Sequence, residues 1–400
     1  MLDVSQADAL LIAQTPLWDA EEVSLEQAAG RILREAVRAD RDFPPFARVS
    51  MDGIAIAYTA WQEGRRLFSV LGQIPAGAPP QPSTRPDACW EVATGGVLPP
   101  GTDTVIPYEQ VQISDGQATV TAKEIRPGQN VHPQGKDRRA GEVLLWEGTL
   151  LGAAQVALLA TVGKGRVRVT RRPRVALLAT GDELVDVEEQ PLPWQIRLSN
   201  PQALRALIAP WTEGAVLLHS PDDLETLQTV LPPLLEEYPL TVITGGVSAG
   251  KRDAVPDVLR AAGVEVLFHK VAQRPGKPFL FARTRAGGAV FALPGNPVSA
   301  FMCAVRYILP WLRRASGAEP APEQWAVLAE PLVFKPDLTW FVPVSIENRR
   351  GMLLAHPQPG HGSGDLANLH GTQAFLELPR GREHFAAGEA FRLWPYDYPS

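Results

Sequence analysis

Glycine-rich loops after predicted strands carry the residues of this 400-residue chain that are suited to binding an anion. The strand predicted at 240–244 is followed by the loop GGVSAGKRD, which contains Gly245, Gly246, Ser248 and Gly250. Glycines leave the backbone N–H groups of such a loop accessible to a phosphate or another oxyanion at a helix entrance. The spacing matches neither a Walker A loop nor GxGxxG. The loop therefore predicts an oxyanion site, with a ligand-free turn between strand and helix as the alternative.

A second loop, PGNPVS at 294–299, follows the strand predicted at 289–293. It predicts Asn296 as a helix cap and Pro297 at the first helical position, so that Val298 and Ser299 lie in the first turn with free N–H groups. In open α/β sheets, ligands bind at the carboxyl ends of the strands. We therefore expect these loops to meet in one pocket, although a lone motif of this kind is equally a structural turn.

Three basic residues lie close together between those loops, in the segment KVAQRPGKP at 270–278. Pro-Gly suits the centre of a type II turn, which would direct Arg274 and Lys277 outward with Lys270 nearby. The chain as a whole is acidic, with a net charge of −6 and a pI of about 5.7. The cluster therefore predicts a local anion-binding wall, with a solvated surface turn as the alternative.

Carboxylates are the counterpart of this basic segment, and several of them directly follow predicted strands. Oxygen ligands next to phosphates suit Mg²⁺, which keeps several waters and uses one or two carboxylates. A single aspartate at such a position is more often a helix cap or a turn residue, and Asp222 could cap the helix that it precedes. The candidate carboxylates are Asp52, Asp137, Asp182, Glu183, Asp222, Asp223 and Asp253.

Composition and the remaining motifs exclude several other classes of protein. Hydrophobic residues at 45% and charged residues at 20% exclude wholesale disorder, and the acidic balance argues against a nucleic-acid binder. Cys89 and Cys303 lack zinc-ligand spacing, no histidines pair at metal-ligand spacing, and GxSxG does not occur. The longest apolar stretch, 150–163, is shorter than the ~20 residues that span a bilayer. No secretory signal opens the sequence, so we expect a cytoplasmic protein.

The central region, 173–317, is the part of the chain that would position these loops. Predicted strands and helices alternate there, which predicts a mostly parallel sheet covered by helices on both faces. An all-helical domain is the alternative, but the runs lack helical periodicity. The hexamer VALLAT occurs at 156–161 and at 175–180. Its context predicts a helix in the first copy, which ends at a glycine, and a buried strand in the second.

The remaining regions are interpreted from composition. We expect a discontinuous helical domain at 1–41 plus 141–172, with a capped helix at 24–33. The intervening 42–140 is rich in glycine, proline and short β-prone runs, which predicts a β-rich insertion. The last region, 318–400, predicts a small barrel or sandwich. Many of the 38 prolines mark these boundaries and loops.

Six segments together resemble one family, the molybdopterin molybdenumtransferases, which include MoeA and the E domain of gephyrin. The segments are SMDGIA, ATGG, TGDEL, TGGVSAG, RPGKP and LPGNPVS, and they occur in the family's order over essentially the whole chain. The resemblance implies a multidomain α/β protein: a doubly wound, MogA-like molybdopterin-binding domain, a β-rich insertion, a discontinuous dimerisation domain and a C-terminal small β-barrel. It also implies a homodimer in which the partner's insertion domain completes each site, and transient contacts with other proteins of molybdenum cofactor biosynthesis.

The implied reaction inserts molybdate into adenylylated molybdopterin and releases AMP, with Mg²⁺ required. By position, Asp52, Thr94 and Asp137 would reach the site from the insertion domain. Two features depart from the family's usual pattern: Lys136 replaces a common glutamate, and Arg274 replaces a common lysine, which favours bidentate anion contacts. The remaining implied residues are Glu183, Asp222 or Asp223 and Asp253 as catalytic groups, Asp182, Glu183 and Asp253 as metal ligands, and Lys270, Arg274, Lys277, Pro294, Pro297 and Ser299 around molybdate and phosphate.

Two other functions fit parts of this pattern. The adenylyltransferase of the preceding step shares the α/β fold, but that step should not need the insertion or the C-terminal β domain. A non-catalytic pterin-binding or scaffolding protein is the second alternative. The complete set Asp52, Thr94, Asp137, Glu183 and Asp253 argues against it.

Overall fold

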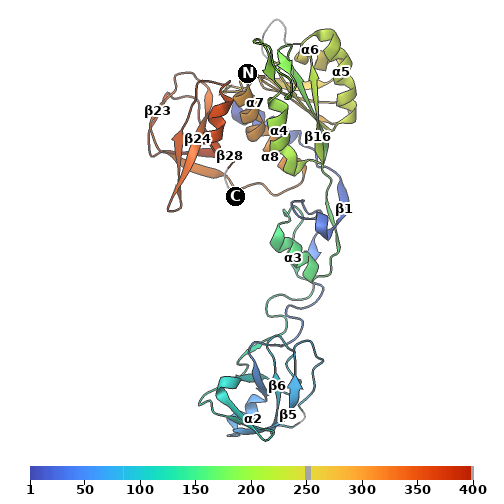
Figure 1. Cartoon of the computed structure of the whole chain (residues 1–400), viewed down its shortest axis with the longest axis vertical. Coiled ribbons are helices and arrows are strands. Elements are labelled where there is room, and N and C mark those ends of the chain that lie inside the picture. Colours follow the sequence, from blue (N-terminus) through green and yellow to red (C-terminus); the bar gives the residue numbers. More distant parts are fainter. Residues whose placement is uncertain (84, 248–253, 398–400) are drawn as a thin grey trace.

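The computed structural model describes residues 1–83, 85–247 and 254–397 of an elongated chain. An α/β domain and a β-barrel lie together at one end, a small middle domain follows, and a separate β-rich domain lies at the other end (Figure 1). Within the described ranges, no helix has the length and apolar character needed to cross a membrane. The elongated arrangement separates the predicted site residues into two groups.

The α/β domain contains a six-stranded sheet. Four neighbouring strands in it are parallel, and each of the last two strands at one edge pairs antiparallel with the strand before it. This confirms the expected alternation of strands and helices, because the buried apolar runs became the central strands. In spatial order the strands are β16 (Gly214–Ser220), β13 (Arg174–Thr180), β17 (Leu240–Thr244), β21 (Ala289–Leu293), β20 (Leu280–Arg283) and β18 (Glu265–His269).

Helices cover both faces of this sheet, so its strands are buried on two sides. One core includes side chains from α4 (Asn200–Ile208), α7 (Pro297–Cys303) and α8 (Leu309–Ala315), and α5 (Leu224–Glu237) and α6 (Val255–Ala261) contribute to the other. The helix predicted to begin at Pro297 is present as α7, which continues through a π-helical turn, η4 (Ala304–Ile308), into α8.

The C-terminal region forms a closed five-stranded barrel, which decides between the barrel and the sandwich. The barrel closes because β26 pairs with both β28 and β24. A short strand of the basic segment, β19 (Gln273–Arg274), pairs in parallel with β24 and thereby joins the α/β domain to the barrel. The barrel strands are β24 (Thr339–Arg349), β25 (Met352–Pro357), β22 (Gln324–Leu328), β28 (Ala390–Pro395) and β26 (Ala374–Leu378), with the pair β23 (Leu332–Val333) and β27 (His384–Phe385) and the turn η5 (Leu366–Gly371) beside them.

A buried arginine joins three elements at the boundary between the α/β domain and the barrel. Arg306, in η4, is 4% exposed and donates to both carboxylate oxygens of Asp8 at 2.8 and 2.6 Å. Its Nε lies 3.4 Å from Oε2 of Glu377 in β26, and its guanidinium carbon lies 4.1 Å from the ring centroid of Trp394 in β28. Asp8 belongs to α1 (Val4–Ala13), which packs on the α/β core. The segment expected at 1–41 is thus divided between two cores.

The middle domain is less helical than its sequence predicts. Its helix α3 (Ala153–Thr161) contains the first VALLAT copy, as expected, but β1 (Ala20–Ser24) pairs with β12 (Arg166–Thr170). The prediction of a capped helix at 24–33 is wrong. Only the turn η1 (Leu25–Gln27) forms, because Gly30 adopts φ +74° and the chain continues into contacts with neighbouring extended segments.

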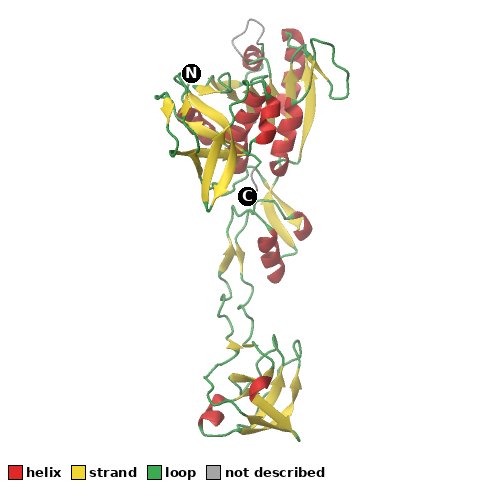
Figure 2. Cartoon of the chain, turned by 60° about the vertical axis from the view of Figure 1, so that its left-hand side comes forward, coloured by secondary structure: helices red, strands yellow, loops and turns green. Residues whose placement is uncertain are grey.

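The insertion contains a six-stranded sheet, which agrees with the β-rich prediction. Two extended segments connect it to the middle domain and run side by side in opposite directions, as Figure 2 shows. They pair at β2 (Val37–Arg38) with β11 (Val143–Leu145), and at β3 (Arg48–Val49) with β10 (Val131–His132). The insertion's elements are β7 (Thr104–Pro107), β4 (Gly53–Ile56), β6 (Ala88–Val92), β5 (Leu67–Ile74), β9 (Gln117–Val120) and β8 (Val111–Ser114) in sheet order, with α2 (Tyr58–Gln62) and η2 (Tyr108–Gln110).

Candidate functional site

A cavity of about 920 Å³ lies where the carboxyl ends of the parallel strands face the barrel. Loops after β13, β17 and β21 reach it, as the sequence predicted, because the carboxyl ends of parallel strands share one edge of a sheet. The side chains of the basic segment also line it. The predicted residues that line this cavity are Glu183, Asp222, Gly245, Gly246, Arg274, Lys277, Pro294, Asn296, Pro297 and Ser299.

The basic segment is held in place from behind by a buried amide. Gln273 is fully buried, and its Nε2 donates to the carbonyl of Gly276 at 3.0 Å. The hydroxyl of Tyr307 donates to Oε1 of the same amide. These contacts fix the turn from its inner side, so that Arg274 and Lys277 are exposed at the cavity wall, as predicted. Lys270 is not among the lining residues.

Gly276 is expected to be intolerant of a side chain, because it has φ +81° and an added Cβ would lie 2.5 Å from Sγ of buried Cys303. We expect Gly276→Ala to lower the free energy of unfolding by about 2–4 kcal/mol, from left-handed strain and overpacking together. Urea denaturation measures this. Gly388→Ala is the matched control, since Gly388 has φ +91° and open space around it. Equal losses in the two variants would contradict tight packing behind the turn.

The glycine-rich loop approaches the sheet closely enough to require glycine. Gly245 has φ +95°, and its N–H donates to the carbonyl of Leu293 at 3.0 Å. Beside it, Oγ1 of Thr180 is buried at the cavity and has no hydrogen-bond partner among the described residues. A ligand oxygen or amide could satisfy this hydroxyl. The predicted residues Ser248, Gly250 and Asp253 lie outside the described residues.

The PGNPVS loop differs from its prediction in two hydrogen bonds. Asn296 is at the N-cap position of α7, but its side chain makes no capping hydrogen bond. Its Nδ2 donates to Oγ of Ser363 at 2.8 Å. The N–H of Val298, expected to be free, donates to the carbonyl of Ser363 at 3.0 Å. The barrel loop thus satisfies one N–H group of the first turn of α7, and Pro294, Pro297 and Ser299 remain at the cavity.

The acids at the strand ends separate into different roles. Asp223, and not Asp222, caps α5: its Oδ1 accepts from the N–H of Thr226 at 2.8 Å, and this bond lowers the pKa of the Asp223 carboxyl. Asp222 lines the cavity, and its N–H donates to Oδ1 of Asp182 at 3.2 Å. Glu183 lies just before the short pair β14 (Leu184–Val185) and β15 (Ile196–Arg197), at the cavity. Asp182 is thus bonded to the backbone of Asp222 and is not among the lining residues.

The described side chains do not provide a complete set of ligands for a metal ion. No group of three or more His, Cys, Asp or Glu side chains with metal-binding geometry occurs in the ranges that the structure describes. The carboxylates of Glu183 and Asp222 at the cavity do fit Mg²⁺, which typically uses one or two carboxylates together with substrate phosphates and water. Of the predicted ligands Asp182, Glu183 and Asp253, Glu183 lines the cavity and Asp182 does not. Asp253 lies outside the described residues.

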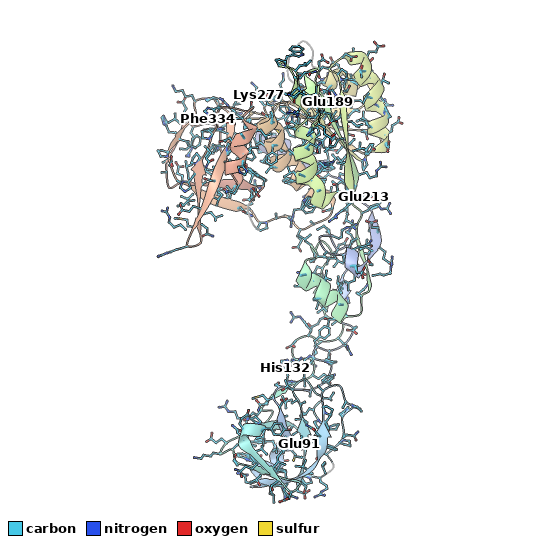
Figure 3. The ribbon with its side chains drawn as sticks, viewed as in Figure 1. Glu91, His132, Glu189, Glu213, Lys277 and Phe334 are labelled. Atoms are coloured by element: carbon cyan, nitrogen blue, oxygen red, sulfur yellow. The ribbon has the colours of Figure 1, made fainter. Side chains whose placement is uncertain are left out.

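The insertion-domain residues lie at the other end of the same chain. Figure 3 labels Glu91 and His132 there, far from Lys277. Asp52 accepts from both the N–H and the Oγ1 of Thr94, at 2.6 and 2.7 Å, and these two bonds lower the pKa of the Asp52 carboxyl. Asp137 pairs with Nε2 of His132 at 2.9 Å. Within one chain, the structure does not bring these residues to the cavity.

Sequence reasoning missed the barrel side of the cavity and its buried supports. Trp340 and Phe334 line the cavity from the barrel, and Ser363 reaches it from a barrel loop. Nothing in the C-terminal sequence distinguishes these residues from barrel core, whereas Thr180 directly precedes the predicted Gly-Asp-Glu loop. Gln273 directly precedes Arg274, and its position as a polar residue before the turn could have indicated its supporting role.

The sheet edge, with its glycine loops, cationic turn and carboxylates, defines the class: an α/β protein with a charged pocket that a second domain completes. Residues 2–163 match the family model described as the MoeA N-terminal region (domain I and II), residues 176–314 match the probable molybdopterin binding domain, and residues 325–396 match the MoeA C-terminal region (domain IV). Three family models therefore match consecutive parts of the chain.

Relatives over the full length agree with these matches. A molybdopterin molybdenumtransferase of Synechocystis sp. is 36% identical, covering 99% of this chain and 100% of the relative, and one of Bacillus subtilis is 31% identical, covering 94% and 89%. The crystal structure of the molybdopterin biosynthesis MoeA protein from Pyrococcus horikoshii OT3 is similar with a TM-score of 0.85 at 28% identity, covering 99% of this chain and 100% of that one. This chain belongs to the molybdopterin molybdenumtransferase family, the transferases of molybdenum cofactor biosynthesis.

Proposed function

We propose that the chain inserts molybdate into adenylylated molybdopterin with release of AMP, in an Mg²⁺-dependent reaction. The observation that carries the proposal is the cavity at which cationic, glycine-rich and carboxylate loops of one sheet edge meet. Molybdate and the phosphate groups of such a substrate are anions. An enzyme for this reaction needs a wall that binds both, and carboxylates close to the bond that breaks.

The basic turn supports the anion-binding part of this reaction. Arg274 and Lys277 lie exposed at the cavity on a turn fixed by Gln273, so their positive charge is positioned before the substrate arrives. Preorganised charge of this kind stabilises the charge that develops on a leaving phosphate. The guanidinium of Arg274 can contact two oxygens of one anion, while Lys277 supplies a point charge.

Glu183 and Asp222 support the cleavage of the phosphoanhydride. Either carboxylate can accept a proton from the water that attacks the phosphorus as AMP leaves. Together with substrate phosphates, both would hold Mg²⁺, which would neutralise the charge of the diphosphate link. The dithiolene sulfurs come from the substrate, so neither buried cysteine, Cys89 or Cys303, is needed as a sulfur ligand.

We further propose that the active unit is a homodimer whose sites combine both subunits. Asp52 and Thr94 belong to the insertion domain, which lies at the far end of the molecule from the cavity of the same chain (Figure 1), and Asp137 lies on one of the extended segments that lead to that domain. A partner chain placed in the opposite direction would bring its insertion domain to that cavity. Two-fold symmetry would then create two equivalent composite sites.

The direct test is AMP release by the purified protein from adenylylated molybdopterin. We expect release to require both molybdate and Mg²⁺, and we expect Glu183→Gln to lower the rate by about 10²-fold or more. Glu188→Gln is the matched control, because Glu188 is exposed and lies outside the cavity lining. AMP is quantified by chromatography, and far-UV circular dichroism checks that both variants are folded.

Other outcomes would identify the alternatives. Pyrophosphate release from ATP and molybdopterin would indicate the adenylyltransferase of the preceding step. Binding of the adenylylated substrate without any turnover would indicate a non-catalytic pterin-binding protein. Either result, with no molybdate-dependent AMP release, would refute the proposed transferase reaction.

A further inference from the structure

The two walls of the cavity have different chemistry. The α/β wall presents the charged and polar groups already described, including Arg274 and Lys277. The barrel wall presents mainly apolar groups, among them Phe334, Leu338 and Trp340. A substrate that consisted only of oxyanions would need the first wall alone. The apolar wall therefore indicates that part of the ligand is itself apolar or aromatic.

The barrel wall is organised around a stacked aromatic pair. The rings of Phe334 and Trp340 have centroids 4.6 Å apart and an interplanar angle of 17°. Phe334 is 7% exposed and belongs to the barrel core, whereas Trp340 is half-buried and lines the cavity. The buried ring thus supports the indole from within the barrel (Figure 3 labels Phe334). Such backing holds the indole in one orientation.

Backbone pairing sets this aromatic pair directly beside the cationic turn. Arg274 in β19 is in register with Trp340 in β24, so the two side chains are neighbours across a parallel strand pair. The guanidinium carbon of Arg274 also lies 5.9 Å from the ring centroid of Phe334. Cation and indole are therefore positioned by the same two hydrogen-bonded strands, and their spacing is a fixed property of the fold.

We propose that Trp340, backed by Phe334, is the stacking platform for a flat nitrogen heterocycle whose phosphate binds Arg274 and Lys277. Stacking a base on an aromatic side chain typically strengthens binding by about 10-fold or more. A phosphate next to a ring matches the adjacency of cation and indole in the cavity. The inference rests on the proposed function, whose substrate carries two such heterocycles, adenine and pterin, each linked to a phosphate.

The test compares ligands with and without a ring, by isothermal titration calorimetry on the full-length protein. The probes are AMP, ribose 5-phosphate, and a pterin that lacks phosphate. We expect Trp340→Leu to weaken binding of AMP or of the pterin by about 10-fold and to leave ribose 5-phosphate binding unchanged. Trp340→Phe should retain most of the affinity, which separates loss of stacking from loss of folding. Trp325→Leu is the matched control, since Trp325 is 53% exposed on β22 and lies outside the cavity lining.

The arms of the experiment identify the ring. A selective loss for AMP assigns adenine to the platform, and a selective loss for the pterin assigns the pterin. Equal losses for AMP and ribose 5-phosphate, unchanged binding of both ring-containing probes, or no binding of either by the unmodified protein would each overturn the proposal. Absence of AMP release from adenylylated molybdopterin, together with ring binding that depends on Trp340, would refute the proposed function and retain the platform.

Discussion

Two inactive variants of this chain should regain activity when their subunits are mixed. Asp52→Ala removes a carboxylate of the insertion domain, and Lys277→Ala removes a cation of the cavity wall. In the proposed homodimer, we expect each variant alone to lose about 10²-fold or more in AMP release, because each change affects both sites. A mixed dimer would contain one site with both defects and one site with neither. After random exchange of equal amounts, about a quarter of all sites should be intact.

The control for this experiment uses two changes on the same side of the proposed composite site. Lys277→Ala mixed with Glu183→Ala should regain no activity, because both residues line the cavity of one chain and every site in the mixture stays defective. Activity is measured as AMP release after exchange, with differently tagged subunits to isolate the mixed dimer. Recovery in both mixtures, or in neither, would contradict a site shared between subunits.

Arg306→Ala is expected to destabilise the protein strongly. The substitution leaves the carboxylates of Asp8 and Glu377 facing each other in a largely buried space without their cation, and it removes the contact with Trp394. Breaking a buried ion pair by removing one partner costs about 3–5 kcal/mol. We expect the free energy of unfolding to fall by about that amount in urea denaturation followed by near-UV circular dichroism.

An exposed ion pair provides the comparison. Arg260 donates to Asp257 at 2.7 Å, one helical turn away, with both side chains more than half exposed. We expect Arg260→Ala to cost less than about 1 kcal/mol, because water and salt screen such pairs. If Arg306→Ala cost no more than Arg260→Ala, the buried arginine would not be what holds α1, the α/β domain and the barrel together.

The sequence was most informative where a pattern had one physical interpretation. The hexamer VALLAT forms part of helix α3 in one copy and part of strand β13 in the other, as predicted from the flanking residues. Local composition is identical, so the difference comes from the surroundings: a glycine-terminated apolar segment in one case, and basic and turn residues in the other. The strand order could not be predicted in this way, but the strand ends and their loops could.

Predictions failed where a side chain had two possible partners. Asn296 was expected to cap α7, but Ser363, 67 residues further along the chain, accepts from its amide. Asp223 caps α5, leaving Asp222 at the cavity, although both aspartates precede the same helix. The capping pattern at Ser24 gave a single turn because Gly30 follows it. The case of Asn296 was decided by a long-range contact, which a linear pattern does not contain.

The site itself was predicted on one wall only. Glycine, proline and charge patterns marked the α/β loops, because anion binding requires those residue types near backbone N–H groups. Trp340 and Phe334 carry no comparable pattern, since aromatic residues in a β-rich segment are equally typical of a barrel core. Only the closure of the barrel and the pairing of β19 with β24 place them beside Arg274.

The length of the paired extended segments between the middle and insertion domains sets the distance between these two domains. Each residue added to both β-type segments would move the insertion domain outward by about 3.3 Å, whereas displacing reacting groups by about 1 Å already slows catalysis strongly. In a shared site, the number of residues from Val37 to Val49 and from Val131 to Leu145 would therefore set how far the insertion domain reaches, so an insertion or deletion in either segment would displace the reacting groups.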